Sequence, residues 1–197
     1  MDAKRIFFVG VGGQGNILAT KLVGEAALIA GVPVTMSETH GMAQRGGVVE
    51  STAVIGAKSP IISDDTSDAI IAFEPLEALR ALPKANSGTT VIMSISRITP
   101  FTVAIGRSSY PDVSQAIDYI TGKVKKVVAF DAMAVAMAVN NPMGVNMVMV
   151  GALYASGILP LSEQNFIQAI KDTTKSVFIE KNIACFEGGI NSFKNAV

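Results

Sequence analysis

The chain has 197 residues, a formal net charge of zero and one cysteine. The zero net charge gives no electrostatic reason to expect nucleic acid or an anionic membrane as the main partner. The single cysteine excludes an intrachain disulfide, an iron–sulfur cluster or a four-cysteine zinc site, so redox or metal chemistry must come from other chains. Hydrophobic residues make up 49% and charged residues 16%, which indicates a face covered by partner subunits and self-association, as a homo-oligomer, when they are absent.

The chain begins with a strand, a helix and a second strand. The apolar run "RIFFVG" (5–10) stops at a glycine and predicts the first strand. A helix is predicted next over residues 16–31, ended by Gly31. One apolar face of this helix carries Leu18, Leu22, Ala26 and Ile29. "VPVTMSE" (32–38) then predicts the second strand, so the opening is a β-α-β unit.

Further strands are predicted at 47–56, 69–73, 89–96 and 125–130, with a helix at 74–82. Residues 99–113 contain proline, glycine and serine, and predict irregular structure with one edge strand. Helices are predicted over 131–139, 145–157, 162–174 and 177–196, with Asp131 interpreted first as a helix N-cap and second as a site residue. This order predicts one α/β domain over 1–197: a three-layer sandwich with a central, mostly parallel or mixed sheet and a helical C-terminal third.

Residues 132–161 carry no charge and resemble a membrane span in composition. Asn140, Pro142 and Gly144 divide the stretch into two pieces, each shorter than the roughly 20 residues that a bilayer requires. Buried helices are therefore the better interpretation. The amino terminus has too short an apolar stretch for a secretion signal, so we expect a cytoplasmic protein.

The glycine-rich turn "GVGGQG" follows the first strand and opens the first helix. Its Gly10, Gly12 and Gly15 match the pattern G-x-G-x-x-G, in which small residues let the backbone approach an anion at a helix N-terminus. Glu38 lies about where a dinucleotide-binding fold places a ribose-binding acid. A tight turn without a ligand, or a contact with another protein, would also select these glycines.

The segment "SETHGMAQRGG" (37–47) holds the only histidine of the chain. Arg45 offers a forked donor for phosphate or carboxylate, and Gln44 can bind a carbonyl or amide. His40 is a candidate acid or base, although a lone histidine is more often a structural hydrogen-bonding group, and Arg45 could form a surface salt bridge. We expect this segment and the glycine-rich turn to leave the C-terminal ends of adjacent strands and to face one cleft. The residues favour a clamp for an anion or a partner over a catalytic centre.

Together, the two segments resemble the gamma subunit or domain of 2-oxoacid:ferredoxin oxidoreductases, the family of the pyruvate, 2-oxoglutarate, 2-oxoisovalerate and indolepyruvate enzymes. The likeness continues through "SPIISDDTSDAIIAFEP" and "NMVMVGAL", and covers most of the chain. Residues 98–123 and the last helix match only loosely.

The resemblance implies a complex that oxidatively decarboxylates a 2-oxoacid with coenzyme A, forming an acyl-CoA and reduced ferredoxin. It implies thiamine diphosphate, Mg²⁺ and iron–sulfur clusters on partner alpha and beta subunits, with or without a ferredoxin-like delta subunit. This chain would bind no cofactor or metal alone and would be inactive in isolation. Candidate contacts for coenzyme A or the subunit joint are Gly10, Gly12, Gly13, Gln14, Gly15, His40, Gly41, Met42, Gln44, Arg45, Gly46 and Gly47. The alternative hypothesis is a free-standing dinucleotide-binding oxidoreductase or regulatory module.

Overall fold

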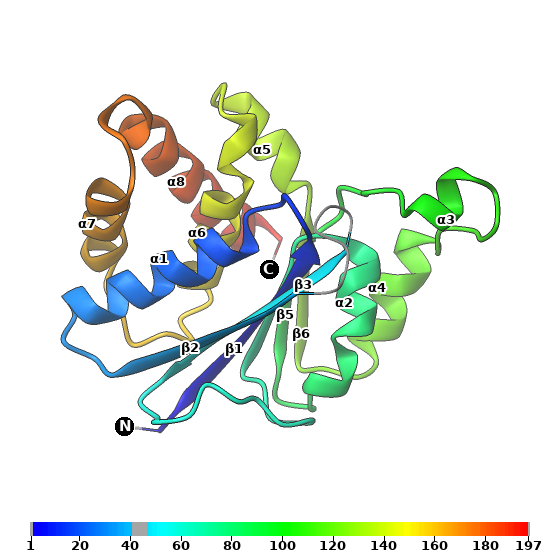
Figure 1. Ribbon diagram of the computed structural model, residues 1–197, viewed down its shortest axis with the longest axis horizontal. Coiled ribbons are helices and arrows are strands. Elements are labelled where there is room, and N and C mark those ends of the chain that lie inside the picture. The colour runs from blue at the N-terminus through cyan, green and yellow to red at the C-terminus, as the bar shows by residue number, and fades with distance from the viewer. Residues whose placement is uncertain (1, 41–46, 197) are drawn as a thin grey trace.

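The computed structural model describes residues 2–40 and 47–196, which are built around one six-stranded sheet (Figure 1). The strands are β1 Lys4–Val11, β2 Val34–His40, β3 Val48–Ile55, β4 Ala69–Ala72, β5 Thr90–Ser94 and β6 Lys126–Phe130. They lie in the order β2-β3-β1-β4-β5-β6. β4, β5 and β6 run parallel to β1, whereas β3 is antiparallel to both β1 and β2. The six strands predicted outside residues 99–113 are confirmed, and the sheet is mixed.

β3 lies between β1 and β2, so the expectation that β1 and β2 are adjacent is wrong. Only residues 41–47 separate β2 from β3, and strands joined by so short a connection pair as an antiparallel hairpin. The other edge of β3 then pairs with β1, from Lys4 opposite Ile55 to Val11 opposite Val48. Because β1 and β2 are both antiparallel to β3, they run in the same direction and end at the same edge of the sheet.

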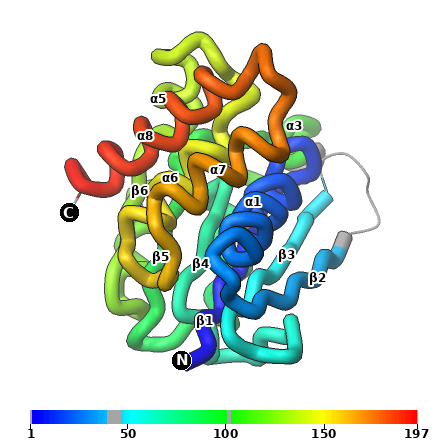
Figure 2. Tube along the Cα trace, turned by 90° about the vertical axis from the view of Figure 1, so that its left-hand side faces the viewer, coloured from blue at the N-terminus to red at the C-terminus, as the bar shows by residue number. Residues whose placement is uncertain are grey.

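Helices cover both faces of the sheet. Figure 1 and Figure 2 show α1, α6, α7 and α8 over one face, and Figure 1 shows α2 and α4 over the other. This arrangement confirms the three-layer sandwich and the helical C-terminal third. The helix bounds are α1 Asn16–Ile29, α2 Pro75–Arg80, α3 Phe101–Ala104, α4 Val113–Thr121, α5 Ala132–Ala138, α6 Val145–Ala155, α7 Glu163–Thr173 and α8 Ile179–Asn195, with short 3₁₀ turns η1 Leu82–Lys84, η2 Pro142–Gly144 and η3 Ser176–Phe178.

The edge strand predicted within residues 99–113 is wrong. This segment contains the short helix α3 and leads into α4. The place beside β5 is taken by β6, which pairs with it from Thr90 opposite Lys126 to Ser94 opposite Phe130. α4 begins at an N-cap, where Asp112 accepts a hydrogen bond of 3.0 Å from the Gln115 amide.

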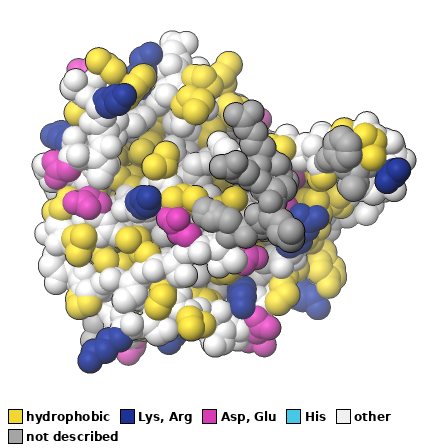
Figure 3. All heavy atoms as spheres, viewed as in Figure 1, with side chains coloured by type: hydrophobic (Ala, Val, Ile, Leu, Met, Phe, Trp, Pro, Cys, Tyr) yellow, Lys and Arg dark blue, Asp and Glu magenta, His cyan; other side chains and the backbone are white. Residues whose placement is uncertain are grey.

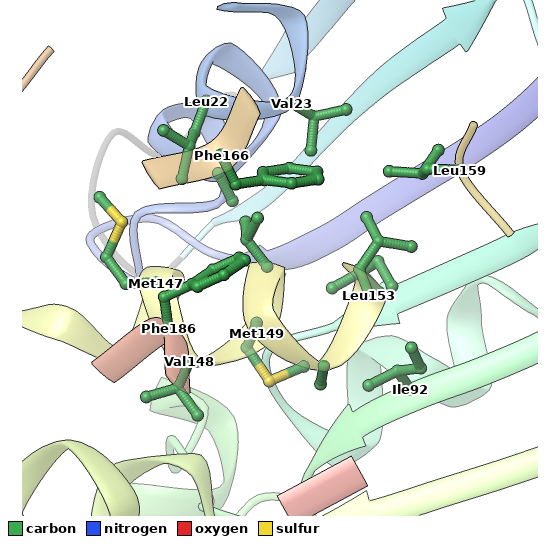
Figure 4. Packing of buried hydrophobic residues seen from close by; sticks show 14 of the residues in the cluster. Leu22, Val23, Ile92, Met147, Val148, Met149, Leu153, Leu159, Phe166 and Phe186 are labelled. Atoms are coloured by element: carbon green, nitrogen blue, oxygen red, sulfur yellow. The ribbon is translucent and has the colours of Figure 1, made fainter. Parts of the chain in front are cut away.

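The alternating side chains of β1 fill two hydrophobic cores, one on each face. Ile6 and Phe8 face the α1 and α6 side, while Phe7 and Val9 face the α2 side, as the two-residue period of a strand requires. On the larger side, Phe166 of α7 and Phe186 of α8 stack with ring centroids 5.5 Å apart (Figure 4). Full burial of such a side chain stabilises the fold by about 1.5–3 kcal/mol.

α6 and α8 cross with their backbones in contact. A Cβ atom added to Gly151 would lie 1.9 Å from the carbonyl oxygen of Phe186, and one added to Gly189 would lie 1.9 Å from that of Val148. Both positions therefore require glycine, because any side chain would push the helices apart.

The uncharged stretch 132–161 forms α5, η2 and α6. α6 lies in the core, with Val148, Met149 and Val150 fully buried, as the sequence predicts. Among the described residues, none of the helices combines the length and the hydropathy needed to cross a membrane.

Candidate functional site

The C-terminal edge of the sheet gathers the loops that carry most of the polar residues considered above. β1, β4, β5 and β6 all end there, because they are parallel, and β2 ends there beside the start of β3. The helix after β1 lies on one face of the sheet and the helix after β4 lies on the other (Figure 1). Such a reversal between neighbouring strands is the usual place for a ligand in open α/β sheets.

The glycine-rich turn uses its small residues for backbone geometry. Gly13 and Gly15 have φ angles of 104° and 81°, in the left-handed region that favours glycine. A Cβ atom at Gly10 would lie 2.9 Å from Gln14 Oε1 and 3.0 Å from Phe73 Cβ, so β1 and the end of β4 approach closely. The turn thus needs these glycines for its own packing.

The Gln14 side chain bridges the C-terminal ends of β1 and β4. Its Oε1 accepts a hydrogen bond of 2.7 Å from the Val11 amide, and its Nε2 donates one of 2.9 Å to the Phe73 carbonyl. Both ends of the side-chain amide are therefore engaged within the chain, at the point where a dinucleotide-binding fold would admit a pyrophosphate.

α1 and α6 begin close together on the other side of this turn. Neither helix has a side-chain cap, and a Cβ atom at Gly15, the N-cap of α1, would lie 3.3 Å from Asn146 Cβ in the first turn of α6. Asn146 is only 4% exposed, and its side chain makes no hydrogen bond within the described part of the chain. Uncapped helix N-termini attract anions.

Asn146 lines a cleft of about 630 Å³ that opens beside the two helix starts. Lys21 and Lys175 contribute positive charge from opposite walls, and neither forms an ion pair with another described residue. The walls are otherwise largely apolar. A cleft of this size and lining fits a ligand with an anionic group and an apolar body. The lining residues are Leu18, Lys21, Leu22, Asn141, Met143, Asn146, Met147, Thr173, Thr174, Lys175, Phe178 and Asn182.

The base of the cleft is a hydrogen-bonded network of amides. Asn141 Nδ2 donates to Asn182 Oδ1 at 2.8 Å, and Asn182 Nδ2 donates to Thr174 Oγ1 at 3.2 Å. Cys185 is buried below Asn141, and burial raises the pKa of its thiol. A thiol held neutral in this way is a poor nucleophile.

A second polar cluster lies on the α2 side of the same edge. Glu74 caps α2 by accepting a 3.0 Å hydrogen bond from the Glu77 amide, and it also accepts a hydrogen bond from the Tyr110 hydroxyl. Both carboxylates are almost fully buried, and burial raises the pKa of Glu77 although Arg80 donates to its Oε1 at 2.6 Å. Burial and the neighbouring Glu74 also raise the pKa of Tyr110.

The histidine-containing segment reaches the glycine-rich turn through its last residue. The Gly12 amide donates a 2.9 Å hydrogen bond to the Gly47 carbonyl, and the backbone of His40 ends β2 opposite Val49. Gly41, Met42, Gln44, Arg45 and Gly46 lie outside the described residues. The structure therefore brings Gly47 to the turn, and the roles assigned to the other residues of this segment stay predictions.

Sequence reasoning does not identify five residues of these two clusters: Lys21, Lys175, Asn146, Glu74 and Tyr110. Lys21 and Lys175 lie far apart along the chain and line the same cleft because α1 packs against α7. The position of Glu74 at a helix start could be predicted, since it stands directly before a proline. Nothing in the sequence pairs it with Tyr110.

Comparison with known proteins identifies relatives of the whole chain. A family model described as pyruvate ferredoxin/flavodoxin oxidoreductase matches residues 5–192. The indolepyruvate oxidoreductase subunit IorB of Methanothermobacter thermautotrophicus is 38% identical over 188 residues, which is 95% of this chain and 96% of that protein.

Two solved structures share the fold. The gamma subunit of a keto/oxoacid ferredoxin oxidoreductase from Geobacter sulfurreducens is 23% identical, with a TM-score of 0.72 over 98% of this chain and 99% of the other. A 2-oxoglutarate:ferredoxin oxidoreductase from Magnetococcus marinus, solved with 2-oxoglutarate, coenzyme A and succinyl-CoA bound, is 20% identical. Its TM-score is 0.76 over 100% of this chain and 32% of that chain.

Proposed function

The chain belongs to the pyruvate ferredoxin/flavodoxin oxidoreductase family and is the gamma-type subunit of a 2-oxoacid:ferredoxin oxidoreductase, and we propose that its complex acts on an aromatic 2-oxoacid of the indolepyruvate type. The observation that carries this proposal is the 38% identity to an indolepyruvate oxidoreductase subunit over nearly the whole of both chains. The complex would work in the cytoplasm, as a single-domain gamma subunit joined to alpha and beta subunits, with ferredoxin as electron acceptor.

The chemistry would be supplied by the partners. Thiamine diphosphate with Mg²⁺ and iron–sulfur clusters on the partners would supply activation of the 2-oxoacid and electron transfer. A chain with one buried cysteine does not fit such a cluster. The role left to this chain is to guide coenzyme A and to join the subunits.

The cleft beside α1 and α6 suits coenzyme A. Lys21 and Lys175 would attract the phosphates of coenzyme A. Leu18, Met143 and Phe178 would cover the less polar part of the coenzyme A molecule. The glycine-rich turn, with Gly10, Gly12, Gly13, Gln14 and Gly15, would form the adjacent wall through its backbone.

The alternative, a dinucleotide-binding module, has less support. Gln14 spans the crevice in which a pyrophosphate would lie. Glu38 is on β2, two strands from β1, which is about 9–10 Å at the usual strand spacing. Tight binding of NAD by the isolated chain, measured by calorimetry, would favour this alternative over the subunit role.

The cleft assignment predicts a selective loss of coenzyme A affinity. In the assembled enzyme, Lys21→Ala combined with Lys175→Ala should raise KM for coenzyme A by about tenfold, because two charge-assisted contacts to phosphate are lost. KM for indolepyruvate should stay within about twofold of the wild-type value, since its pocket would lie on another subunit. The control is Lys171→Ala, at an exposed lysine of α7 outside the cleft. An unchanged KM for coenzyme A would remove the cleft from the proposal.

Arg45 is the clamp predicted by the sequence. Arg45→Ala should cost about 1.5–3 kcal/mol, or one to two orders of magnitude in coenzyme A affinity, and Arg45→Lys should restore only part because it lacks the guanidinium fork. The measurement needs mutant complexes shown to be intact by size-exclusion chromatography. Dissociation of the Arg45→Ala complex would instead assign Arg45 to the subunit joint.

A further inference from the structure

Residues 95–111, which we call the arm, leave the C-terminal edge of the sheet after β5. Figure 1 shows α3, in the middle of this segment, projecting from the body of the molecule, and Figure 3 shows the projection as a separate knob. The hydrogen bonds of α3 run within the arm, from the amides of Val103 and Ala104 to the Pro100 carbonyl. The projecting part is thus a small local unit extended away from the core.

The arm is fixed to the body at both ends. At its start, Ser96 Oγ donates a 2.6 Å hydrogen bond to Asp131, the N-cap of α5. At its end, the Tyr110 hydroxyl donates to Glu74, the buried N-cap of α2. Because Asp131 and Glu74, the N-caps of α5 and α2, both accept hydrogen bonds from the arm, the fold sets the direction in which the arm projects.

The surface of the arm combines apolar and basic side chains. Ile95, Ile98 and Ile105 are 37%, 38% and 45% exposed, which is unusual for isoleucine. Arg97 and Arg107 are exposed as well, and neither forms an ion pair within the described residues. Residues 95–111 include no aspartate or glutamate. In Figure 3 yellow and dark blue side chains lie together on the knob.

We propose that the arm docks into an apolar groove, lined by carboxylates, on the thiamine-binding partner subunit. Burial of the isoleucines would supply affinity, and the arginines would supply orientation through charge-assisted hydrogen bonds. A second copy of this chain is a poorer occupant, because a two-fold contact between arms would set arginines against arginines. Nucleic acid would leave the isoleucines exposed. This inference rests on the proposed function only for the existence of the partner.

Association of the purified wild-type chain and its variants with the partner subunit tests the arm. Ile105→Asp, and the pair Arg97→Glu with Arg107→Glu, should each weaken binding by about tenfold or more, because a carboxylate would face a carboxylate or enter an apolar groove. The matched control is Lys171→Glu with Lys194→Glu, which makes the same charge change on α7 and α8. Ile105→Asp and the lysine control should keep the wild-type melting temperature, since their substituted side chains are exposed. Arg97 lies over the Tyr110 ring at 5.5 Å from its centroid, so binding by the arginine pair is compared at a temperature where that variant is folded. Variants that bind like the wild type would overturn the proposal.

Crosslinking identifies the occupant of the arm. Cys185 is fully buried, so Ile105→Cys provides a single reactive thiol for a thiol-directed photo-crosslinker. The expected product joins residue 105 to a partner peptide that is rich in aspartate or glutamate. Crosslinks only to a second copy of this chain, or to a basic peptide, would contradict the proposed groove.

The proposed substrate and the proposed docking surface are tested by independent measurements. Turnover of indolepyruvate by the wild-type complex tests the proposed function, whereas the affinities of the arm variants test the docking surface. A complex that assembles through the arm but oxidises a different 2-oxoacid would overturn the substrate and support the arm.

Discussion

At the scale of single residues, the C-terminal edge of the sheet carries acids that cap helices. Asp131 accepts hydrogen bonds from Ser96 Oγ at 2.6 Å and from the Ala134 amide at 2.9 Å, and these lower the pKa of its carboxyl. The sequence predicts this cap from an acid between a strand and a helix, and the structure confirms it. Its link to Ser96 joins β5 and β6 at the base of the arm.

Loss of the Asp131 cap should destabilise the protein in a pH-dependent way. Asp131→Ala should lower the free energy of unfolding by about 1 kcal/mol at neutral pH. A lowered pKa means that the ionised carboxylate stabilises the fold above the unfolded-state pKa, near 4, and that this contribution is lost as the pH falls through the folded-state value. Urea unfolding at pH 7 and near pH 3 should therefore show a difference in the free energy of unfolding between wild type and variant that narrows in acid.

Asp131→Asn serves as the control, because asparagine also caps helices and does not titrate. Its difference from Asp131→Ala should stay nearly constant with pH. A gap between wild type and Asp131→Ala that is equally large at both pH values would contradict the assigned role of the carboxylate.

Sequence reasoning finds site residues that sit in local patterns and misses those that need the fold. Gly13 and Gly15 were identifiable because a tight turn before a helix requires positive φ angles. The engagement of Gln14 with Phe73 depends on β4 lying beside β1, which no spacing along the chain encodes. The lysine pair of the cleft was missed for the same reason.

At the scale of secondary-structure elements, the crossing of α6 and α8 is the tightest contact in the helical layer. It depends on Gly151 and Gly189, whose Cα atoms face the carbonyl oxygens of the opposite helix. Close backbone approach lets Phe166 and Phe186 fill the space around the crossing (Figure 4). The position of α6, and with it Asn146 in the cleft, follows from this contact.

Gly189→Ala should therefore be strongly destabilising. The added Cβ atom would lie 1.9 Å from the Val148 carbonyl oxygen, and relief requires the helices to separate, so we expect a loss of about 3 kcal/mol or more. Gly122→Ala is the control, because its Cβ would meet only ordinary contacts of 3.7 and 3.8 Å. Thermal unfolding of both variants is the measurement, and equal melting temperatures would disprove the tight crossing.

The sequence predicts the positions of the strands better than their arrangement. Short apolar runs between glycines and polar turns mark each of them, whereas the insertion of β3 between β1 and β2 is a matter of pairing between distant segments. α4 was missed although it has an N-cap at Asp112 and apolar residues at Val113, Ile117 and Ile120. Proline, glycine and serine just before it made the whole segment look irregular.

At the scale of the whole molecule, the surface of the chain has apolar features expected of a subunit. It carries exposed apolar side chains on the arm and near the cleft, including Ile105, Met143 and Phe178. The composition, with 49% hydrophobic residues and no net charge, agrees with this description. The fold class could be predicted from the alternation of strands and helices, and the family could be predicted from the two glycine-rich segments.

The isolated chain should have no oxidoreductase activity. The measurement is an assay with 2-oxoacids, coenzyme A, thiamine diphosphate and a viologen dye as electron acceptor. No turnover above a protein-free control is expected, since electron transfer needs clusters that a single buried cysteine cannot hold. Adding the partner subunits to the same sample should restore turnover, and activity before their addition would contradict the subunit role.

The contact between α1 and α7 bears on how the protein is made. The buried face of α1, which includes Leu22 and Ala26 but not the exposed Leu18 and Ile29, packs against α7 close to the other end of the chain. Leu22 belongs to the same buried cluster as Phe166 of α7. During translation the first β-α-β unit must therefore wait, with that face exposed to water, until the C-terminal third has left the ribosome. A chain released early by truncation would present this face to the quality-control machinery of the cell.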